Sequence, residues 1–114
     1  MLQRSYRMQK KSNFQNVFAI GKSYLSRHVV IYIVKDRPIK YGIIASKKVG
    51  NAIRRNRAKR LLRETIRLNQ DRLRVDCQMI FIARAAINDA SLREVEKSVL
   101  YIWRKAGIFN GKNS

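Results

Sequence analysis

Seven Lys or Arg residues lie between Asn51 and Gln70, where Glu64 is the single acid. Guanidinium and ammonium groups at this density bind phosphates, and they do so best where no carboxylate competes for them. A charged helix that meets only solvent normally carries both signs, so that pairs form four residues apart. This stretch does not, and we interpret it as a surface for a polyanion, with a solvated charged helix as the alternative.

The same stretch has the periodicity of an amphipathic helix. Side chains that suit a buried face recur at helical spacing: Ala58, Leu61, Leu62, Thr65 and Ile66. At about 100° per residue, the far side of the helix carries the cations Lys59, Arg60, Arg63 and Arg67. One face is therefore expected to pack on the protein and the other to meet the polyanion.

The start of this helix is also marked. Asn51 directly follows Gly50 and is the expected N-cap, because its side chain can accept a hydrogen bond from the first turn. Lys47 and Lys48 extend the positive charge upstream of the cap. We expect the basic surface to begin in this turn and to continue along the helix.

The composition favours nucleic acid as the partner. Lys and Arg number 26 against seven Asp and Glu, which gives a net charge of +19. An anionic membrane is the competing partner, but the basic residues are spread through predicted elements and are not gathered beside an apolar span. No segment resembles a signal peptide or a membrane span, so we expect a cytoplasmic protein.

The elements around the basic helix predict one domain, residues 1–114, in which helices pack on a single sheet. Strands are expected at 29–34, 41–46 and 79–83, with a shorter one at 21–26. Ser12 with Gln15, and Ser91 with Glu94, have the spacing of capping boxes that begin two more helices. Residues 1–11 and 107–114 are expected to be flexible.

Three aromatic residues have two interpretations each. Phe14 and Phe18 lie one turn apart on a short predicted helix, where burial is the default and partial exposure is the alternative. Tyr32 points to the opposite side of its strand from Ile31 and Ile33. It is either a buried tyrosine or a platform on which a base stacks.

Residues for catalysis by the protein itself are missing from the pattern. The carboxylates are scattered through turns and helix exteriors, and the glycines lack the spacing of a phosphate-binding loop. Cys77 and His28 are single residues of their kinds, so neither a disulfide nor a Cys/His metal site is expected. Cys77 is most simply a buried hydrophobe. DNA is not expected as a partner, because no helix-turn-helix or zinc module is recognisable.

The segment 46–64, with Arg55, Asn56 and Arg57 at its centre, closely resembles the signature of the bacterial ribonuclease P protein subunit. The similarity extends from about Lys10 to about Ala106 and includes the Phe14–Phe18 helix. The resemblance implies an α+β fold: an α/β sandwich with a central, mostly antiparallel sheet and a left-handed βαβ crossover around the basic helix.

The resemblance also implies a function and a set of partners. Such proteins form a complex with one catalytic RNA, here expected as a 1:1 complex with a monomer, and assist the removal of the 5′ leader from precursor tRNA. The RNA performs the hydrolysis with Mg2+, which RNA phosphates chiefly bind. The leader would lie in a cleft formed by Phe14, Phe18 and Tyr32. The catalytic RNA would be contacted by Lys47, Lys48, Asn51, Arg55, Asn56, Arg57, Lys59, Arg60, Arg63 and Arg67.

Two other functions share parts of this pattern. A ribosomal or other RNA-packaging protein would have similar size and charge, and would co-sediment with a ribosomal subunit in high salt. A nuclease made of protein alone would cleave RNA in rigorously RNA-free preparations. The unpaired carboxylates argue against the nuclease.

Overall fold

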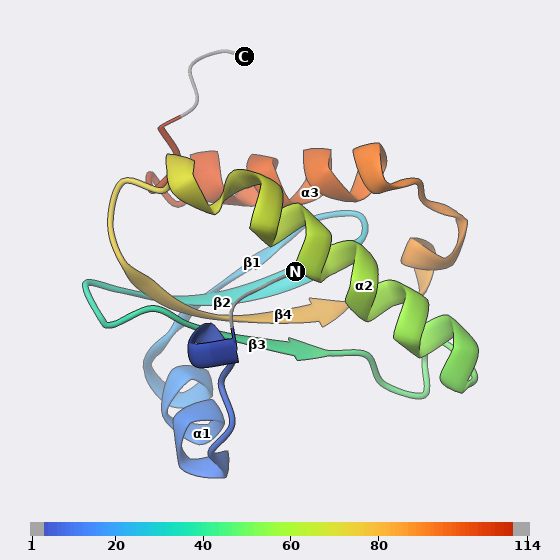
Figure 1. Ribbon diagram of the computed structural model, residues 1–114, viewed down its shortest axis with the longest axis horizontal. Helices are drawn as coiled ribbons and strands as arrows, with labels where there is room; N and C mark the ends of the chain where they lie inside the picture. Colours follow the sequence, from blue (N-terminus) through green and yellow to red (C-terminus); the bar gives the residue numbers. More distant parts are fainter. Residues whose placement is uncertain (1–3, 111–114) are drawn as a thin grey trace.

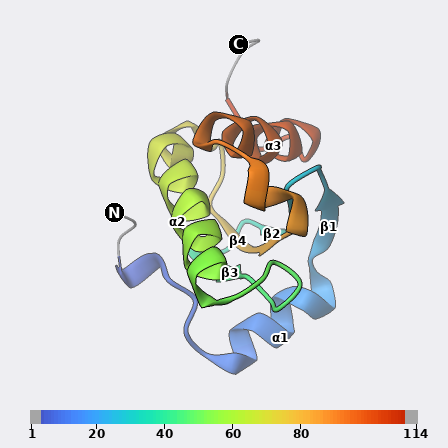
Figure 2. The ribbon, with the colours of Figure 1, turned by 90° about the vertical axis from the view of Figure 1, so that its right-hand side faces the viewer.

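A four-stranded sheet separates two layers of helix in the computed structural model, which describes residues 4–110 (Figure 1). Helix α1 covers one face of the sheet, and α2 and α3 cover the other (Figures 1 and 2). In chain order the elements are η1 (Arg4–Tyr6), α1 (Lys11–Ile20), β1 (Lys22–Leu25), β2 (Val29–Lys35), β3 (Lys40–Ile44), α2 (Ala52–Asn69), η2 (Gln70–Arg72), β4 (Cys77–Ala83), η3 (Ala85–Asp89) and α3 (Leu92–Lys105).

The strands lie in the order β1-β2-β4-β3. The β1–β2 and β2–β4 pairs are antiparallel, whereas β3 and β4 are parallel neighbours joined through α2. In Figure 2 both strands run toward the viewer and α2 lies to their left, so the chain turns in the left-handed sense as it passes from β3 to β4. This confirms the α+β fold and its unusual crossover, which runs against the general right-handed preference.

Both faces of the sheet are apolar along β2, which consists mostly of β-branched residues. Val29, Ile31 and Ile33 of β2 point into the larger core, beneath α2 and α3. Tyr32 and Val34 point the other way, into a smaller cluster beneath α1. A strand that is covered on both faces needs apolar side chains at every position, which explains why the sequence does not alternate.

The capping predictions had mixed outcomes. Asn51 caps α2, and Ser91 with Glu94 forms a complete capping box on α3, as expected. The predicted box at Ser12 is wrong, because α1 begins at Lys11 after Lys10, whose side chain makes no capping hydrogen bond. None of the helices within residues 4–110 has the length and apolar character that a membrane crossing requires.

The structure orders parts of both chain ends that were expected to be flexible. Met8 is buried, and its N–H donates to the carbonyl of Tyr41, so the N-terminal segment lies along the edge of β3. Ile108 and Phe109 are buried beside Trp103 in the larger core. The expectation failed at these positions because apolar side chains within otherwise polar ends reach the core. Residues 1–3 and 111–114, also expected to be flexible, lie outside the described part.

Candidate nucleic-acid interface

Helix α2 divides into a buried stripe and a basic face. Four of the five predicted stripe residues are fully buried: Ala58, Leu62, Thr65 and Ile66. Leu61 is only partly buried and lies at the margin of the core. The stripe seats the helix on the sheet and against α3, so the cations between its positions are turned outward.

The turn before α2 presents two lysines. Lys47 and Lys48 are both exposed there. Gly50 has φ 135°, a backbone conformation that residues other than glycine rarely adopt, and it directly precedes the capping residue. Asn51 Oδ1 accepts a hydrogen bond from the Arg54 N–H at 3.0 Å, so this side chain is engaged in starting the helix.

Arg57 makes contacts within the protein. Its Nη2 donates to the carbonyl of Ala90 at 2.6 Å, and its Nη1 donates to the carbonyl of Ile87 at 3.1 Å. These carbonyls belong to η3 and the residue that follows it. Arg57 therefore ties the segment before α3 to α2, a role that the spacing of the motif does not reveal.

The other motif residues differ in their surroundings. Asn56 and Arg60 are exposed, whereas Lys59 and Arg55 are partly buried. The Nε of Arg55 is buried and has no hydrogen-bond partner among the described residues. Arg67 lies at the far end of the basic face. Its Nη2 and Nε donate to the two carboxylate oxygens of Glu64 at 2.6 and 3.0 Å, and this is the single ion pair within residues 4–110.

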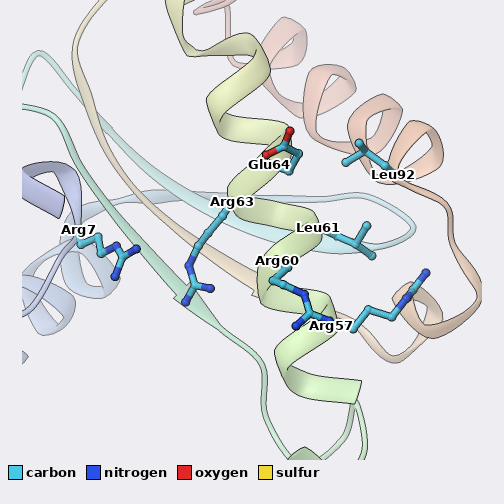
Figure 3. Close-up of a pocket in the computed structure, with 7 residues that line it drawn as sticks. All are labelled: Arg7, Arg57, Arg60, Leu61, Arg63, Glu64 and Leu92. Carbon is cyan, nitrogen blue, oxygen red and sulfur yellow. The ribbon is translucent and has the colours of Figure 1, made fainter. Parts of the chain in front are cut away.

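Arg63 lies near a second arginine, which the sequence analysis left in a flexible end. Arg7 comes from the N-terminal segment and approaches α2 from the β3 side (Figure 3). Partial burial lowers the pKa of Arg63, and the charge of Arg7 acts in the same direction. The Nε of Arg7 is buried without a hydrogen-bond partner in the described part of the chain. Two neighbouring guanidinium groups with no carboxylate between them favour an anion.

The three predicted cleft residues lie on the α1 side of the sheet, opposite α2, where Phe18 of α1 meets Tyr32 of β2 and Phe14 of α1 packs over β3. The rings of Phe18 and Tyr32 meet edge to face, with centroids 4.9 Å apart. Phe18 remains 39% exposed, so the alternative of partial exposure holds for it. Phe14 is half-buried over Gly42, where an added Cβ would lie 2.5 Å from the Phe14 ring.

The aromatic side and the basic helix meet at the β3 edge of the sheet. A depression of about 120 Å³ there is lined by residues from both: Arg7, Met8, Phe14, Tyr41, Ile43 and Arg63. The place of Arg7 at this site could not be predicted from the sequence. It depends on the pairing of Arg7 with Tyr41, a contact between distant parts of the chain.

The cysteine and the histidine that the sequence singles out are both buried. Cys77 is buried as predicted, and burial raises the pKa of its thiol to about 11. His28 is buried too, with its Nδ1 2.7 Å from the Ser98 hydroxyl oxygen. Within residues 4–110, His, Cys, Asp and Glu side chains nowhere gather in threes or more as a metal ion would need.

Comparisons with known proteins agree on one family. The model of the ribonuclease P family matches residues 2–107. A ribonuclease P protein component from Clostridium botulinum (strain Loch Maree / Type A3) is 39% identical over 107 residues, covering 91% of this chain and 96% of the relative. The structure is similar to that of the RNase P protein from Staphylococcus aureus, with a TM-score of 0.81, 31% identity and coverage of 100% and 99%. It is also similar to that of the RNase P protein from Thermotoga maritima, with a TM-score of 0.76, 25% identity and coverage of 87% and 96%.

Proposed function

Because the chain belongs to the ribonuclease P protein family, we propose that it binds the catalytic RNA of ribonuclease P and holds the 5′ leader of precursor tRNA beside it. Members of the family are the protein component of an enzyme that processes tRNA, and the reaction belongs to that holoenzyme. The proposal concerns which surface of this chain meets which RNA.

One observation carries the assignment of the catalytic RNA to α2. The exposed side of this helix and the turn before it present Lys47, Lys48 and Arg60 with no acid opposite them in the described residues. These cations reduce the repulsion between two polyanions and bind the RNA backbone through its phosphates. Arg67 can bind a phosphate only if it gives up its ion pair with Glu64. Arg57 stabilises this surface through its hydrogen bonds to the segment before α3.

The leader is assigned to the α1 side of the sheet. An unpaired strand offers the faces of its bases, and the exposed ring of Phe18 there meets the partly buried ring of Tyr32. The depression at Arg7 and Arg63 continues this side toward α2. The leader would thus lie along the aromatic side while the catalytic RNA contacts the basic helix.

Magnesium is assigned to the RNA. The described residues do not fit a protein-bound metal, since their carboxylates, His28 and Cys77 are not gathered into a ligand set. The contribution of this chain is to bind and orient the two RNAs, in a 1:1 complex of protein and catalytic RNA.

Reconstitution tests the function directly. The protein is mixed with the catalytic RNA and precursor tRNA at low magnesium, and release of the leader is measured against the RNA alone. We expect stimulation, because the added cations replace part of the screening that magnesium would supply. No stimulation at any magnesium concentration would refute the proposal. RNA-free protein serves as the control for a protein-only nuclease and is expected to release no leader.

The leader assignment has its own test in Phe18→Ala. Loss of one stacking ring should weaken the binding of precursor tRNA to the holoenzyme by about five- to thirtyfold and leave the binding of mature tRNA unchanged. Ile20→Ala is the matched control, because Ile20 is an exposed apolar residue of the same helix. Equal losses for both RNAs would contradict the assignment to the leader.

A further inference from the structure

A groove lies between the middle of α2 and the start of α3, in the helical layer opposite the aromatic side (Figure 3). Its volume is about 420 Å³, and most of its lining surface is apolar. Leu61 and Leu92 are the apolar residues of this lining, and the arginines around it are Arg7, Arg57, Arg60 and Arg63. An apolar hollow within a strongly basic surface needs an explanation beyond phosphate binding.

Leu92 is the unusual member of this lining. It is half-exposed, and it belongs to neither of the two apolar clusters of the fold. It is the first residue of α3, directly after the Ser91 cap, and the reciprocal hydrogen bonds of Ser91 and Glu94 fix the helix there. Leu92 is therefore held in place with an apolar side chain that the protein covers only in part.

Arg57 and Asn88 keep the two walls of the groove together. Arg57 on α2 donates to the carbonyls of Ile87 and Ala90, just before α3. Asn88 Nδ2 donates to the carbonyl of Val49, in the turn before α2, at 2.6 Å. These hydrogen bonds fix the segment before α3 both to α2 and to the turn before α2. The groove between the two helices is therefore formed before any ligand arrives.

Two of the arginines at the rim, Arg60 and Arg63, form no ion pair within residues 4–110. Glu64, the acid in the lining, is paired with Arg67 at 2.6 Å, and the only ion pair of the described residues is this one. Arg60 and Arg63 thus border an apolar surface without an acid of their own. A regular duplex keeps its base faces stacked inside and would offer the leucines only phosphates, sugars and base edges, whereas an unstacked nucleotide has both a phosphate and a largely apolar base face.

We propose that this groove seats one unstacked nucleotide of the catalytic RNA, with its base against Leu61 and Leu92 and its phosphate at Arg60 or Arg63. The proposal rests on the proposed function, because it deepens the contact of α2 with that RNA. The leader is the less suitable occupant, since the aromatic side that would hold it lies across the sheet. A second copy of the protein is disfavoured by its own positive charge.

The first test separates apolar from ionic contact. Leu92→Ala should weaken binding of the catalytic RNA about five- to tenfold while the slope of affinity against salt stays unchanged, because no charge is removed. Leu25→Ala is the matched control, an exposed leucine on β1 at the other edge of the sheet. Leu92→Met keeps an apolar side chain of similar volume and should bind like the unaltered protein.

The results are read against leader release by the unaltered protein. If that protein stimulates release but Leu92→Ala binds the RNA as tightly as Leu25→Ala does, the nucleotide site is wrong and the proposed function stands. If the unaltered protein gives no stimulation, the proposed function itself fails. A loss in Leu92→Met equal to that in Leu92→Ala would also overturn the site, because the apolar contact would then not be the cause.

The second test identifies the occupant. Cys77 is buried, so Leu92→Cys adds an accessible thiol that can carry a photoreactive group. In the reconstituted holoenzyme we expect crosslinking to the catalytic RNA at one nucleotide. Crosslinks spread over many nucleotides, to the leader, or to a second copy of the protein would each overturn the proposal.

Discussion

At the scale of the residue, identical side chains on one helix have different tasks. Arg57 donates hydrogen bonds to the carbonyls of Ile87 and Ala90, whereas Arg60, one turn further along the helix, is exposed. A motif read along the sequence treats the two arginines alike. Their environments predict that one acts on the stability of the protein and the other on its affinity for RNA.

Neutralising each arginine tests this division. Arg60→Gln should lower the magnitude of the slope of log affinity against log salt by about 0.7 to 0.9, the contribution of one phosphate contact, without a change in stability. Arg57→Gln should lower the free energy of unfolding by about 1.5–3 kcal/mol, because charged hydrogen bonds to partly buried carbonyls are lost. Urea unfolding and RNA titrations at several salt concentrations give both quantities. A smaller salt slope with unchanged stability in Arg57→Gln would make Arg57 a phosphate contact instead.

His28 predicts a pH dependence of stability. Burial lowers the pKa of His28, Arg27 acts in the same direction, and Glu94 opposes both. The unfolded chain then takes up a proton more readily than the folded one, so stability is complete above the usual pKa of 6.5 and falls as the pH drops below it. We expect the urea midpoint to decrease between about pH 7.5 and about pH 5.5. His28→Asn should flatten this part of the profile, and an unchanged decrease in that variant would exclude His28 as its source.

At the scale of the element, the basic helix could be predicted in detail and its surroundings could not. The stripe of Ala58, Leu62 and Ile66 and the Asn51 cap depend on local spacing, which the sequence contains. The approach of Arg7 to Arg63 and the partial exposure of Leu92 depend on contacts between segments far apart in the chain. The Ser12 capping box failed because α1 already begins one residue before Ser12, after Lys10.

The contact between α1 and β3 depends on a glycine. Gly42 leaves room for the Phe14 ring, since a Cβ at this position would lie 2.5 Å from one ring carbon and 2.9 Å from another. Gly42→Ala should therefore lower the free energy of unfolding by about 1–3 kcal/mol as the ring is displaced. Adding Phe14→Leu should restore part of this loss, because the smaller side chain relieves the overlap. Strictly additive losses in urea unfolding would show that the two residues do not interact.

At the scale of the whole molecule, the charge that attracts RNA also opposes folding. The net charge is +19 on a chain of 114 residues, and the described residues contain a single ion pair to offset it. Repulsion between like charges is screened by salt, and so is attraction to phosphate. The free protein and its RNA complex should therefore respond to salt in opposite directions.

This opposition can be measured in one series of buffers. Between about 20 and about 300 mM KCl, we expect the urea midpoint of the free protein to rise, because repulsion within the folded chain weakens. Over the same range the affinity for the catalytic RNA should fall steeply as counterions compete for its phosphates. A urea midpoint that is constant or falls with added KCl would show that repulsion between like charges does not significantly destabilise the folded protein.

The strand order also sets the sequence of events during synthesis. β2 and β3 follow each other in the chain, but the strand between them is β4, which is made only after α2. β4 is the common neighbour of β2 and β3 in the sheet. Until Ala83 has been added, neither strand can form all of its hydrogen bonds to β4. A direct β2–β3 hairpin, the easiest pairing for the growing chain, must therefore stay open or reopen to admit β4. The sheet on which both proposed RNA-binding sides depend thus closes late, after the basic helix has already been translated.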